Sequence, residues 1–191
     1  LGVQAPPNFD RDIRPQAVDK GDTLKLKIPF AGNGPFDFKL KKDNVSVPSS
    51  NNRVKVEEFD DYVVFHIKDA DLDDSGDYKI EVSNDSGTAS ASFPVKVKAP
   101  PGKPTGPLEA SDVTKSTLNL RWKAPRDDGG ARVQHYVVER KEVGKPYWTT
   151  VASFCKDPEC EVQGLYENKE YEFRVAAVNE NGQGEFLTTD T

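Results

Sequence analysis

Short runs in which every second residue is apolar recur along this chain, each bounded by glycine, proline, asparagine or aspartate. In TLKLKIPF the alternation places Leu24, Leu26, Ile28 and Phe30 on one face. Successive side chains of a strand point to opposite faces, so a period of two predicts strands with one buried side. Helical periodicity is almost absent, and we therefore predict an all-β protein. The other runs in the first half are FDFKL at 36–40, VVFHI at 63–67, YKIEV at 78–82 and FPVKV at 93–97.

The second half of the chain repeats this alternation with different residues. LNLRW sets Leu118, Leu120 and Trp122 on one face, and the pattern continues in YVV at 136–138 and YEFRVAAVN at 171–179. An apolar sheet face has to be covered, so each half predicts a second sheet packed on the first. The length of 191 residues suits two such domains, each with a modest core. We predict two β-sandwiches in tandem.

A proline-rich stretch, KAPPGKPTGP at 98–107, divides the two halves. Its four prolines cannot pair in a central strand. We therefore place the first domain at residues 1–98, a short linker at 99–103 and the second domain at 104–191.

The linker is expected to be semi-rigid. Pro100, Pro101 and Pro104 fix their own φ and push the residues before them toward extended conformations, and short proline-rich segments act as stiff spacers. Gly102 is the one permissive joint in this segment. We therefore expect limited bending at Gly102 instead of free tumbling of the two domains.

The charge distribution argues against nucleic acid and membrane surfaces as partners. The chain carries 26 basic and 32 acidic residues, a net charge of −6, divided evenly between its halves. Neither half has the basic field that nucleic acid or an anionic membrane requires. No apolar run approaches the roughly 18 residues of a membrane span, and the sequence does not open on a signal-peptide pattern. We expect no nucleic acid and no membrane among the partners.

One acidic stretch, DADLDDSGDY at 69–78, raises the question of a calcium site. An EF-hand loop needs glycine at its sixth position and a bidentate carboxylate at its twelfth. Counting from Asp71 puts Gly76 sixth but Val82 twelfth, so the coordination sphere cannot close. We therefore predict a corner between two sheets at this stretch, and no metal or other cofactor.

The same stretch resembles the immunoglobulin fold. An acidic residue, Gly76 and Tyr78 stand ahead of a strand as they do in intermediate-set immunoglobulin domains, where the tyrosine closes the corner between two strands. The resemblance implies that Gly76 permits a tight backbone and that the hydroxyl of Tyr78 has a buried partner. It also implies that Asp74 pairs with Arg53.

The first domain departs from that family at its most typical positions. Ile28 and Ile80 stand where the paired inter-sheet cysteines would be, and Leu40 stands where the core tryptophan would be. The two isoleucines replace the covalent tie with about 1.5–3 kcal/mol of burial per side chain, and they do so in any redox environment. This departure favours the cytoplasm over a secreted location.

The second domain resembles fibronectin type III modules. Trp122 fits the tryptophan of an early strand, and Leu165 and Tyr171 in GLYENKEY fit that family's own tyrosine corner. The sequence of residues 106–130, together with the following YVVERKE, is similar to the sequences of fibronectin modules in titin-like giant muscle proteins. Together with a cysteine-free immunoglobulin module, the whole chain resembles a tandem from such a giant protein.

No catalytic constellation is present in the sequence. His66 alternates out of phase with its apolar neighbours and is expected to point to solvent, and His135 precedes Tyr136 at the start of a strand. Neither histidine has a plausible nucleophile or metal set. We expect no catalytic residue and no enzyme activity in this chain, although the giants of the family often carry a kinase domain elsewhere.

The only two cysteines, Cys155 and Cys160, flank the turn residues KDPE. Their spacing is neither the metal nor the thioredoxin signature. One interpretation is a redox pair or a small disulfide across a hairpin. We favour two small buried hydrophobic residues, because a cytoplasmic setting keeps thiols reduced.

The resemblance implies a structural and interaction module of the sarcomere. Its role would be a mechanically resistant spacer along the thick filament, in the A-band, monomeric as a fragment. The implied partners are myosin, other thick-filament proteins and neighbouring modules of the same chain. The rival is a cell-adhesion or receptor ectodomain, which predicts a disulfide across the first domain and sugars at Asn44 or Asn84. Ile28 and Ile80 contradict that disulfide.

Overall fold

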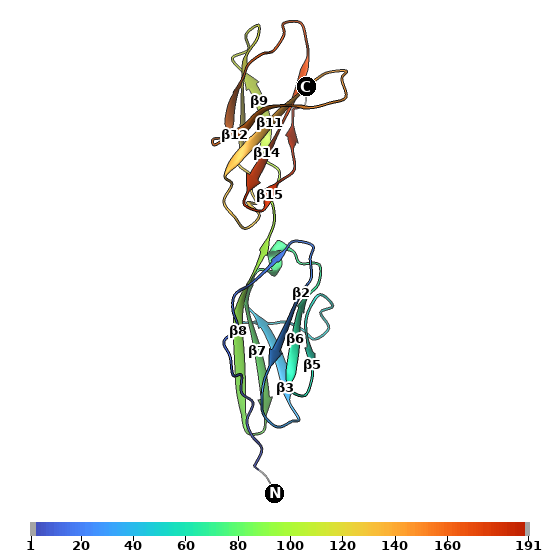
Figure 1. The fold of residues 1–191 in the computed structure, drawn as a ribbon, viewed down its shortest axis with the longest axis vertical. Coiled ribbons are helices and arrows are strands. Elements are labelled where there is room, and N and C mark those ends of the chain that lie inside the picture. Colours follow the sequence, from blue (N-terminus) through green and yellow to red (C-terminus); the bar gives the residue numbers. More distant parts are fainter. Residues whose placement is uncertain (1–2, 190–191) are drawn as a thin grey trace. The chain divides into compact units, whose positions relative to one another are not determined.

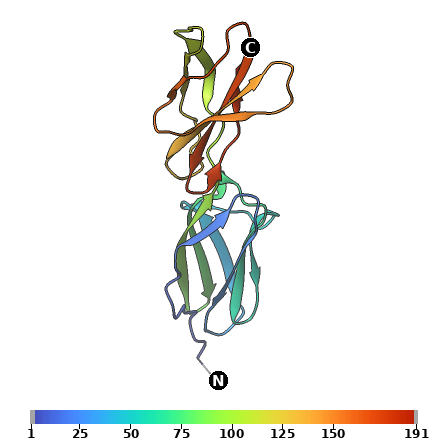
Figure 2. The ribbon, with the colours of Figure 1, turned by 45° about the horizontal axis from the view of Figure 1, so that its top comes forward.

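The computed structural model describes residues 3–189 and divides into two compact units, with the division between Lys98 and Ala99. In each unit the strands form two layers (Figure 1, Figure 2). The prediction of an all-β protein with two sandwiches is therefore confirmed. Within the described residues, no helix is both long and apolar enough to cross a membrane.

Eight strands and one short 3-10 helix form the described part of the first unit. They are β1 (Gln16–Asp19), β2 (Leu24–Pro29), β3 (Asp37–Lys42), β4 (Val45–Ser46), β5 (Val54–Glu58), β6 (Tyr62–Ile67), η1 (Leu72–Asp74), β7 (Gly76–Asn84) and β8 (Gly87–Lys98). One sheet has the order β1-β8-β7-β3-β4, and the other has the order β2-β6-β5. All paired strands are antiparallel except β1 and β8, which run parallel.

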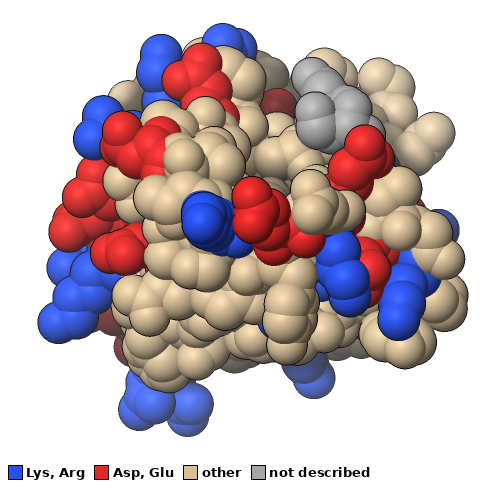
Figure 3. Space-filling view, turned by 90° about the horizontal axis from the view of Figure 1, so that it is seen from above, with Lys and Arg blue, Asp and Glu red and all other residues tan. Residues whose placement is uncertain are grey.

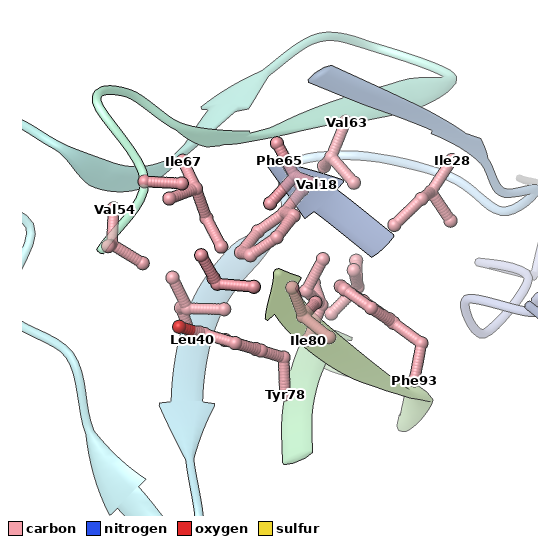
Figure 4. Close-up of a cluster of buried hydrophobic side chains, with 14 of the residues drawn as sticks. Val18, Ile28, Leu40, Val54, Val63, Phe65, Ile67, Tyr78, Ile80 and Phe93 are labelled. Atoms are coloured by element: carbon pink, nitrogen blue, oxygen red, sulfur yellow. The ribbon is translucent and has the colours of Figure 1, made fainter. Parts of the chain in front are cut away.

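The apolar alternation decides which side chains of the first unit are buried. The inward positions of β6 and β7 are almost completely buried, because each strand lies between two others and faces the opposite sheet. Figure 4 shows side chains from both sheets pointing into one cluster. Its buried members are Val18, Ile28, Phe30, Leu40, Val54, Val63, Phe65, Ile67, Ala70, Tyr78, Ile80, Val82, Phe93, Val95 and Val97.

Eight further strands form the described part of the second unit. They are β9 (Thr105–Ser111), β10 (Leu118–Lys123), β11 (His135–Glu142), β12 (Thr149–Cys155), β13 (Glu159–Val162), β14 (Tyr171–Asn179), β15 (Gly182–Gln183) and β16 (Leu187–Thr188). One sheet has the order β13-β10-β9, and the other has the order β12-β11-β14-β15, with β16 also paired to β14. Pro107, the last proline of the dividing stretch, lies in β9, which accepts it because β9 is an edge strand.

Trp122 belongs to the buried core of the second unit. It is 5% exposed on β10, and its ring packs edge-on against Tyr136 of β11 with 5.3 Å between the ring centroids. Because β10 and β11 belong to different sheets, this aromatic pair joins the two layers. Edge-to-face pairs contribute about 0.5–1.5 kcal/mol beyond the area that they bury.

The expectation that His66 points to solvent is wrong, because the residue is only 9% exposed. It does lie out of phase with the core on β6, but Lys25 and Lys55 stand directly opposite it on the two neighbouring strands. The aliphatic stems of lysines shield the surface beside them. Nε2 of His66 also lies 3.3 Å from Oε1 of Glu57. The outer face of a central strand is therefore covered here by its neighbours.

Candidate functional site

The structure shows no cluster of side chains with the composition of a metal site in the described residues. Among residues 3–189, no group of three or more His, Cys, Asp and Glu side chains is placed to hold a metal ion. On the face shown in Figure 3, basic and acidic side chains are interspersed. The features that remain as candidates are structural: the corner near Tyr78, the paired strands β1 and β8, and the segment that enters the second unit.

The acidic stretch after β6 forms a hydrogen-bonded corner around Asp74. The Asp74 carboxylate is buried and accepts hydrogen bonds of 2.9 Å from the guanidinium of Arg53 and of 2.8 Å from the backbone N–H of Asp71. The hydroxyl of Tyr78 donates to the carbonyl oxygen of Asp74 over 2.6 Å. The hydrogen bonds to the Asp74 carboxylate are charge-assisted, and such bonds are stronger than bonds between neutral groups. The corner thereby ties η1 to β7 and to the segment that precedes β5.

The Tyr78 hydroxyl stays a hydrogen-bond donor at any physiological pH. Burial, followed by the charges of Asp74 and Asp43, raises the pKa of this phenol well above its ordinary value. Loss of the proton would leave a buried negative charge beside two carboxylates, which is unfavourable.

Gly76 lies where side chains approach closely, and its backbone is not the tight one that the resemblance implied. Its φ is outside the left-handed region. A Cβ at this position would lie 2.7 Å from Oδ2 of Asp43, whose Oδ1 accepts a 2.9 Å hydrogen bond from the backbone N–H of Asp77. Glycine therefore leaves room for the Asp43 carboxylate at the start of β7.

Replacing Arg53 with alanine is expected to lower the free energy of unfolding of the first domain by about 1–3 kcal/mol, because the buried Asp74 carboxylate loses its cationic partner. The matched control is Lys55→Ala, an exposed residue of β5, for which a change within about 0.5 kcal/mol is expected. Urea denaturation followed by circular dichroism measures both variants. Equal effects of the two substitutions would mean that the Arg53 and Asp74 pair is not stabilising.

Ile28, Ile80 and Leu40 lie together in the core of the first unit. Ile28 is on β2 and Ile80 is on β7, so they come from opposite sheets and point into the same cluster (Figure 4). Leu40 on β3 stands directly beside Ile80 in the strand register. Ile80 is completely buried, Ile28 is 3% exposed and Leu40 is 8% exposed. Aliphatic packing thus fills the positions that the resemblance assigned to a cystine and a tryptophan.

The first and last strands of the first unit form a parallel pair. Gln16 lies opposite Val95, and Asp19 lies opposite Lys98. One further hydrogen bond continues the pair, from the backbone N–H of Lys20 to the carbonyl oxygen of Lys98 over 2.8 Å. Pulling β1 toward its start and β8 toward its end moves two parallel strands in opposite directions. The hydrogen bonds between them are then loaded together, in shear.

The predicted linker is anchored to the second unit by its own backbone. The Ala99 carbonyl oxygen accepts hydrogen bonds from Nδ2 of Asn179 over 2.9 Å and from Nδ2 of Asn181 over 3.2 Å. The Ala99 N–H donates to Gly129 over 3.0 Å, and the Gly102 N–H donates to Asp127 over 2.8 Å. The segment from Ala99 to Gly102 therefore belongs with the second unit, and the joint expected at Gly102 is held by a hydrogen bond.

Two glycines let loops of the second unit approach this segment. A Cβ at Gly129 would overlap the carbonyl oxygens of Ala99 and Pro100, and a Cβ at Gly184 would overlap that of Pro101. Gly129 also has a φ of +74°, a conformation that favours glycine. The loops that contain DDGG and NENGQG thus form a cradle for the entering chain, which no local pattern in the sequence indicates.

The prolines of the linker differ in their surroundings. Pro101 and Pro104 are buried, whereas Pro100 is exposed and its ring lies 3.8 Å from the position of a Cβ at Gly182.

Asn179 is a residue that the sequence interpretation missed, and it is 3% exposed at the end of β14. A fully buried amide needs partners for its N–H groups, and this one bonds the carbonyl oxygens of Ala99 and Asp128.

The second unit has a tyrosine corner of a different construction. The phenol oxygen of Tyr171, at the start of β14, accepts a 3.0 Å hydrogen bond from the backbone N–H of Tyr166. Leu165 packs against the core beside it, and its own N–H donates to Ser116 over 3.0 Å. Leu165 and Tyr171 are therefore brought together at one end of the core, as the resemblance implied for these positions.

Two family profiles match the chain, one for each unit. The Immunoglobulin I-set domain matches residues 7–97, and the Fibronectin type III domain matches residues 100–189. Both are non-catalytic modules, in agreement with the expectation that this chain is not an enzyme. Only residues 98 and 99 lie between the two matched ranges.

The curated proteins that are similar to this chain include a myosin-binding protein and two titins. The chain is 31% identical over 166 residues to human Myosin-binding protein C, slow-type, covering 86% of this chain and 14% of that protein. It is 33% identical over 174 residues to the Titin homolog of Caenorhabditis elegans, covering 89% of this chain and 1% of that protein. It is 34% identical over 176 residues to Titin of Drosophila melanogaster, covering 92% and 1%. The chain thus spans a small part of each relative.

The solved structures that are similar to this chain include fragments of titin. Domains A168–A170 from titin match with a TM-score of 0.59 and 23% identity, covering 98% of this chain and 65% of that one. The I-band fragment I67–I69 from titin matches with a TM-score of 0.59 and 19% identity, covering 99% and 66%. At these identities the likeness shows the fold.

Proposed function

Because this chain is an immunoglobulin I-set domain followed by a fibronectin type III domain and belongs with the titin-like muscle proteins, we propose that it is a mechanically resistant spacer along the thick filament. The observation that carries this proposal is the parallel pairing of β1 with β8. Force applied through the neighbouring modules would reach these two strands first. Several hydrogen bonds would then have to break together before the first domain could unfold.

The anchored linker supports the same role. Force that leaves β8 at Lys98 passes directly to Ala99, which the second domain holds through Asn179, Asn181 and Gly129. Because Ala99 and Gly102 are both anchored, the part of the linker that is left free to bend is the bonds between Lys98 and Ala99. We propose that this anchoring makes the connection between the domains stiffer than a linker of five free residues would be.

Substituting Lys20 with proline tests the mechanical role. Lys20 precedes Gly21 in a turn closed by the N–H of Asp22 on the carbonyl of Asp19, and Gly21 has a φ of +88°. Proline is favoured at this position of such a turn, so Lys20→Pro deletes the N–H that bonds Lys98 and keeps the turn. The unfolding force of the first domain in single-molecule stretching is expected to fall, while its equilibrium stability changes by no more than about 1.5 kcal/mol.

The matched control for this experiment is Lys20→Ala, which keeps the backbone N–H. Its unfolding force should equal that of the unchanged chain, because the exposed lysine side chain is not part of the strand pair. If the proline and alanine variants unfold at the same force, the pairing of β1 with β8 does not bear the load, and the spacer proposal loses its mechanical basis.

We propose myosin, other thick-filament proteins and adjacent modules of the same giant chain as the partners, in the A-band of the sarcomere. The names of two relatives state that those proteins bind myosin. The chain is expected to co-sediment with synthetic myosin filaments and not with actin filaments. Sedimentation with neither would remove myosin from the proposal. Within the family, we propose that the whole chain is most like twitchin, with titin and projectin as the alternatives.

Asn84 distinguishes this proposal from a cell-surface role. A sugar at this asparagine would be attached to Nδ2, but Nδ2 donates hydrogen bonds of 2.7 Å to Ala5 and of 2.9 Å to Asn33. The atom is therefore engaged within the domain. Together with the aliphatic pair at the cystine positions, this favours a chain that works inside the muscle cell.

A further inference from the structure

Cys155 and Cys160 lie where the chain crosses from one sheet of the fibronectin type III domain to the other. Cys155 is the last residue of β12, in register with Tyr136 on β11. Cys160 is on β13, in register with Leu120 on β10. Since β12 and β13 belong to different sheets, these cysteines stand on opposite layers, separated by one short turn.

The two cysteines both contact the core of the second unit. Both are free and half-buried, and both pack against the hydrophobic cluster around Trp122. Burial, followed by the neighbouring thiol of Cys155, raises the pKa of Cys160 to about 12. The Sγ of Cys160 lies 3.5 Å from the carbonyl oxygen of Glu161. Cys160 also lines a surface hollow of about 310 Å³ between β10 and β13, which leaves it accessible from solvent.

We propose that Cys155 and Cys160 are an oxidation site, at which a low-molecular-weight disulfide such as glutathione disulfide converts the pair into a bridge between the two sheets. The thiolate of Cys155 attacks one sulfur of the reagent, forming a mixed disulfide and releasing one glutathione thiolate. Cys160 then gives its proton to solvent, and its sulfur attacks Sγ of Cys155 and displaces the second glutathione. The two protein thiols lose two electrons and two protons, and the reagent becomes two glutathione thiols.

The buried setting makes this bridge slow to form and slow to break. A thiol with a raised pKa supplies little thiolate for attack, and it is a poor leaving group when a reductant attacks the bridge. Reaction over hours is therefore expected without a catalyst. The bridge would give the second domain the covalent tie between sheets that the aliphatic first domain lacks. The proposal is independent of the spacer role.

The test uses the 191-residue chain incubated with glutathione disulfide well below its melting temperature. Both free thiols are expected to disappear, with a mass loss of about 2 Da for the two hydrogens and a peptide linking residues 155 and 160. Trp122 and Trp148, the only tryptophans, both lie in the second domain, so their fluorescence follows its unfolding alone. The melting midpoint of the oxidised chain is expected to rise by about 10 °C.

Cys155→Ser and Cys160→Ser are the matched controls, because each keeps one thiol and cannot form an internal bridge. Cys160→Ser should stop at a single glutathione adduct on Cys155, and neither variant should show the rise in melting midpoint that the bridge causes. Three results would overturn the proposal: two glutathione adducts on the unchanged chain, a bridge that leaves the melting midpoint equal or lower, or thiols that stay free when the same chain is bridged in denaturant.

Discussion

Replacing Ile80 with alanine is expected to lower the free energy of unfolding of the first domain by about 2–5 kcal/mol. Ile80 is completely buried on β7, between the two sheets and beside Leu40 on β3. Alanine would remove most of a side chain that contacts both layers, and the close-packed core would collapse only in part around the cavity. In a domain without a cystine, this aliphatic packing is what holds the sheets together.

The change can be measured on the two-domain chain because the first domain contains no tryptophan. Urea unfolding followed by circular dichroism detects both domains, whereas tryptophan fluorescence reports the second domain only. Ile80→Ala should shift the first transition and leave the fluorescence transition unchanged. Val45→Ala is the control, since Val45 is 68% exposed on β4. A loss below about 0.5 kcal/mol for Ile80→Ala, the size typical of surface changes, would show that Ile80 does not carry the contact between the sheets.

Replacing Gly129 with alanine is expected to destabilise the second domain by more than about 2 kcal/mol and to release the linker from it. Part of the cost, about 1–2 kcal/mol, comes from placing a Cβ on a residue with a left-handed φ. The rest comes from the overlap of this Cβ with the backbone of Ala99 and Pro100. The segment would have to move away, losing its bonds to Gly129 and to Asn179.

Gly144→Ala separates these two contributions. Gly144 has a φ of +92°, but nothing lies within 4 Å of the position of its Cβ. The two variants therefore share the backbone strain, and only Gly129→Ala pushes against the linker. Tryptophan fluorescence gives the stability of the second domain, and hydrogen exchange at the amides of Ala99 and Gly102 reports whether the segment is released. Equal stability and equal protection in both variants would refute the anchoring.

The sequence predicted the hydrogen bonds of the corner at Asp74, but it did not predict why Gly76 is found there. The resemblance anticipated the hydrogen bonds of Asp74 with Arg53 and with Tyr78, because these residues stand at a spacing that is typical of the family. Gly76 could not be explained in the same way. Its role depends on Asp43, which approaches from a turn 33 residues earlier in the sequence.

The burial of His66 illustrates the same limit. The alternation correctly placed the residue on the outer face of β6, but exposure depends on the side chains of β2 and β5 that flank it. A strand pattern records only which face a residue occupies. Which neighbours cover that face is decided when the strands pair.

By itself, the sequence determined the strands, the faces that they bury and the two sandwich domains, because a period of two acts within each strand and needs no knowledge of its partners. The tertiary structure alone decided how the connecting segment is held. Asn179 and Ala99 are 80 residues apart, and their hydrogen bond exists only because the loops after β10 and β14 meet at one end of the second domain. A hydrogen-bond donor and acceptor leave no shared local pattern when so much chain separates them. The prolines therefore predicted a stiff linker, and the fold supplied the cradle that anchors it.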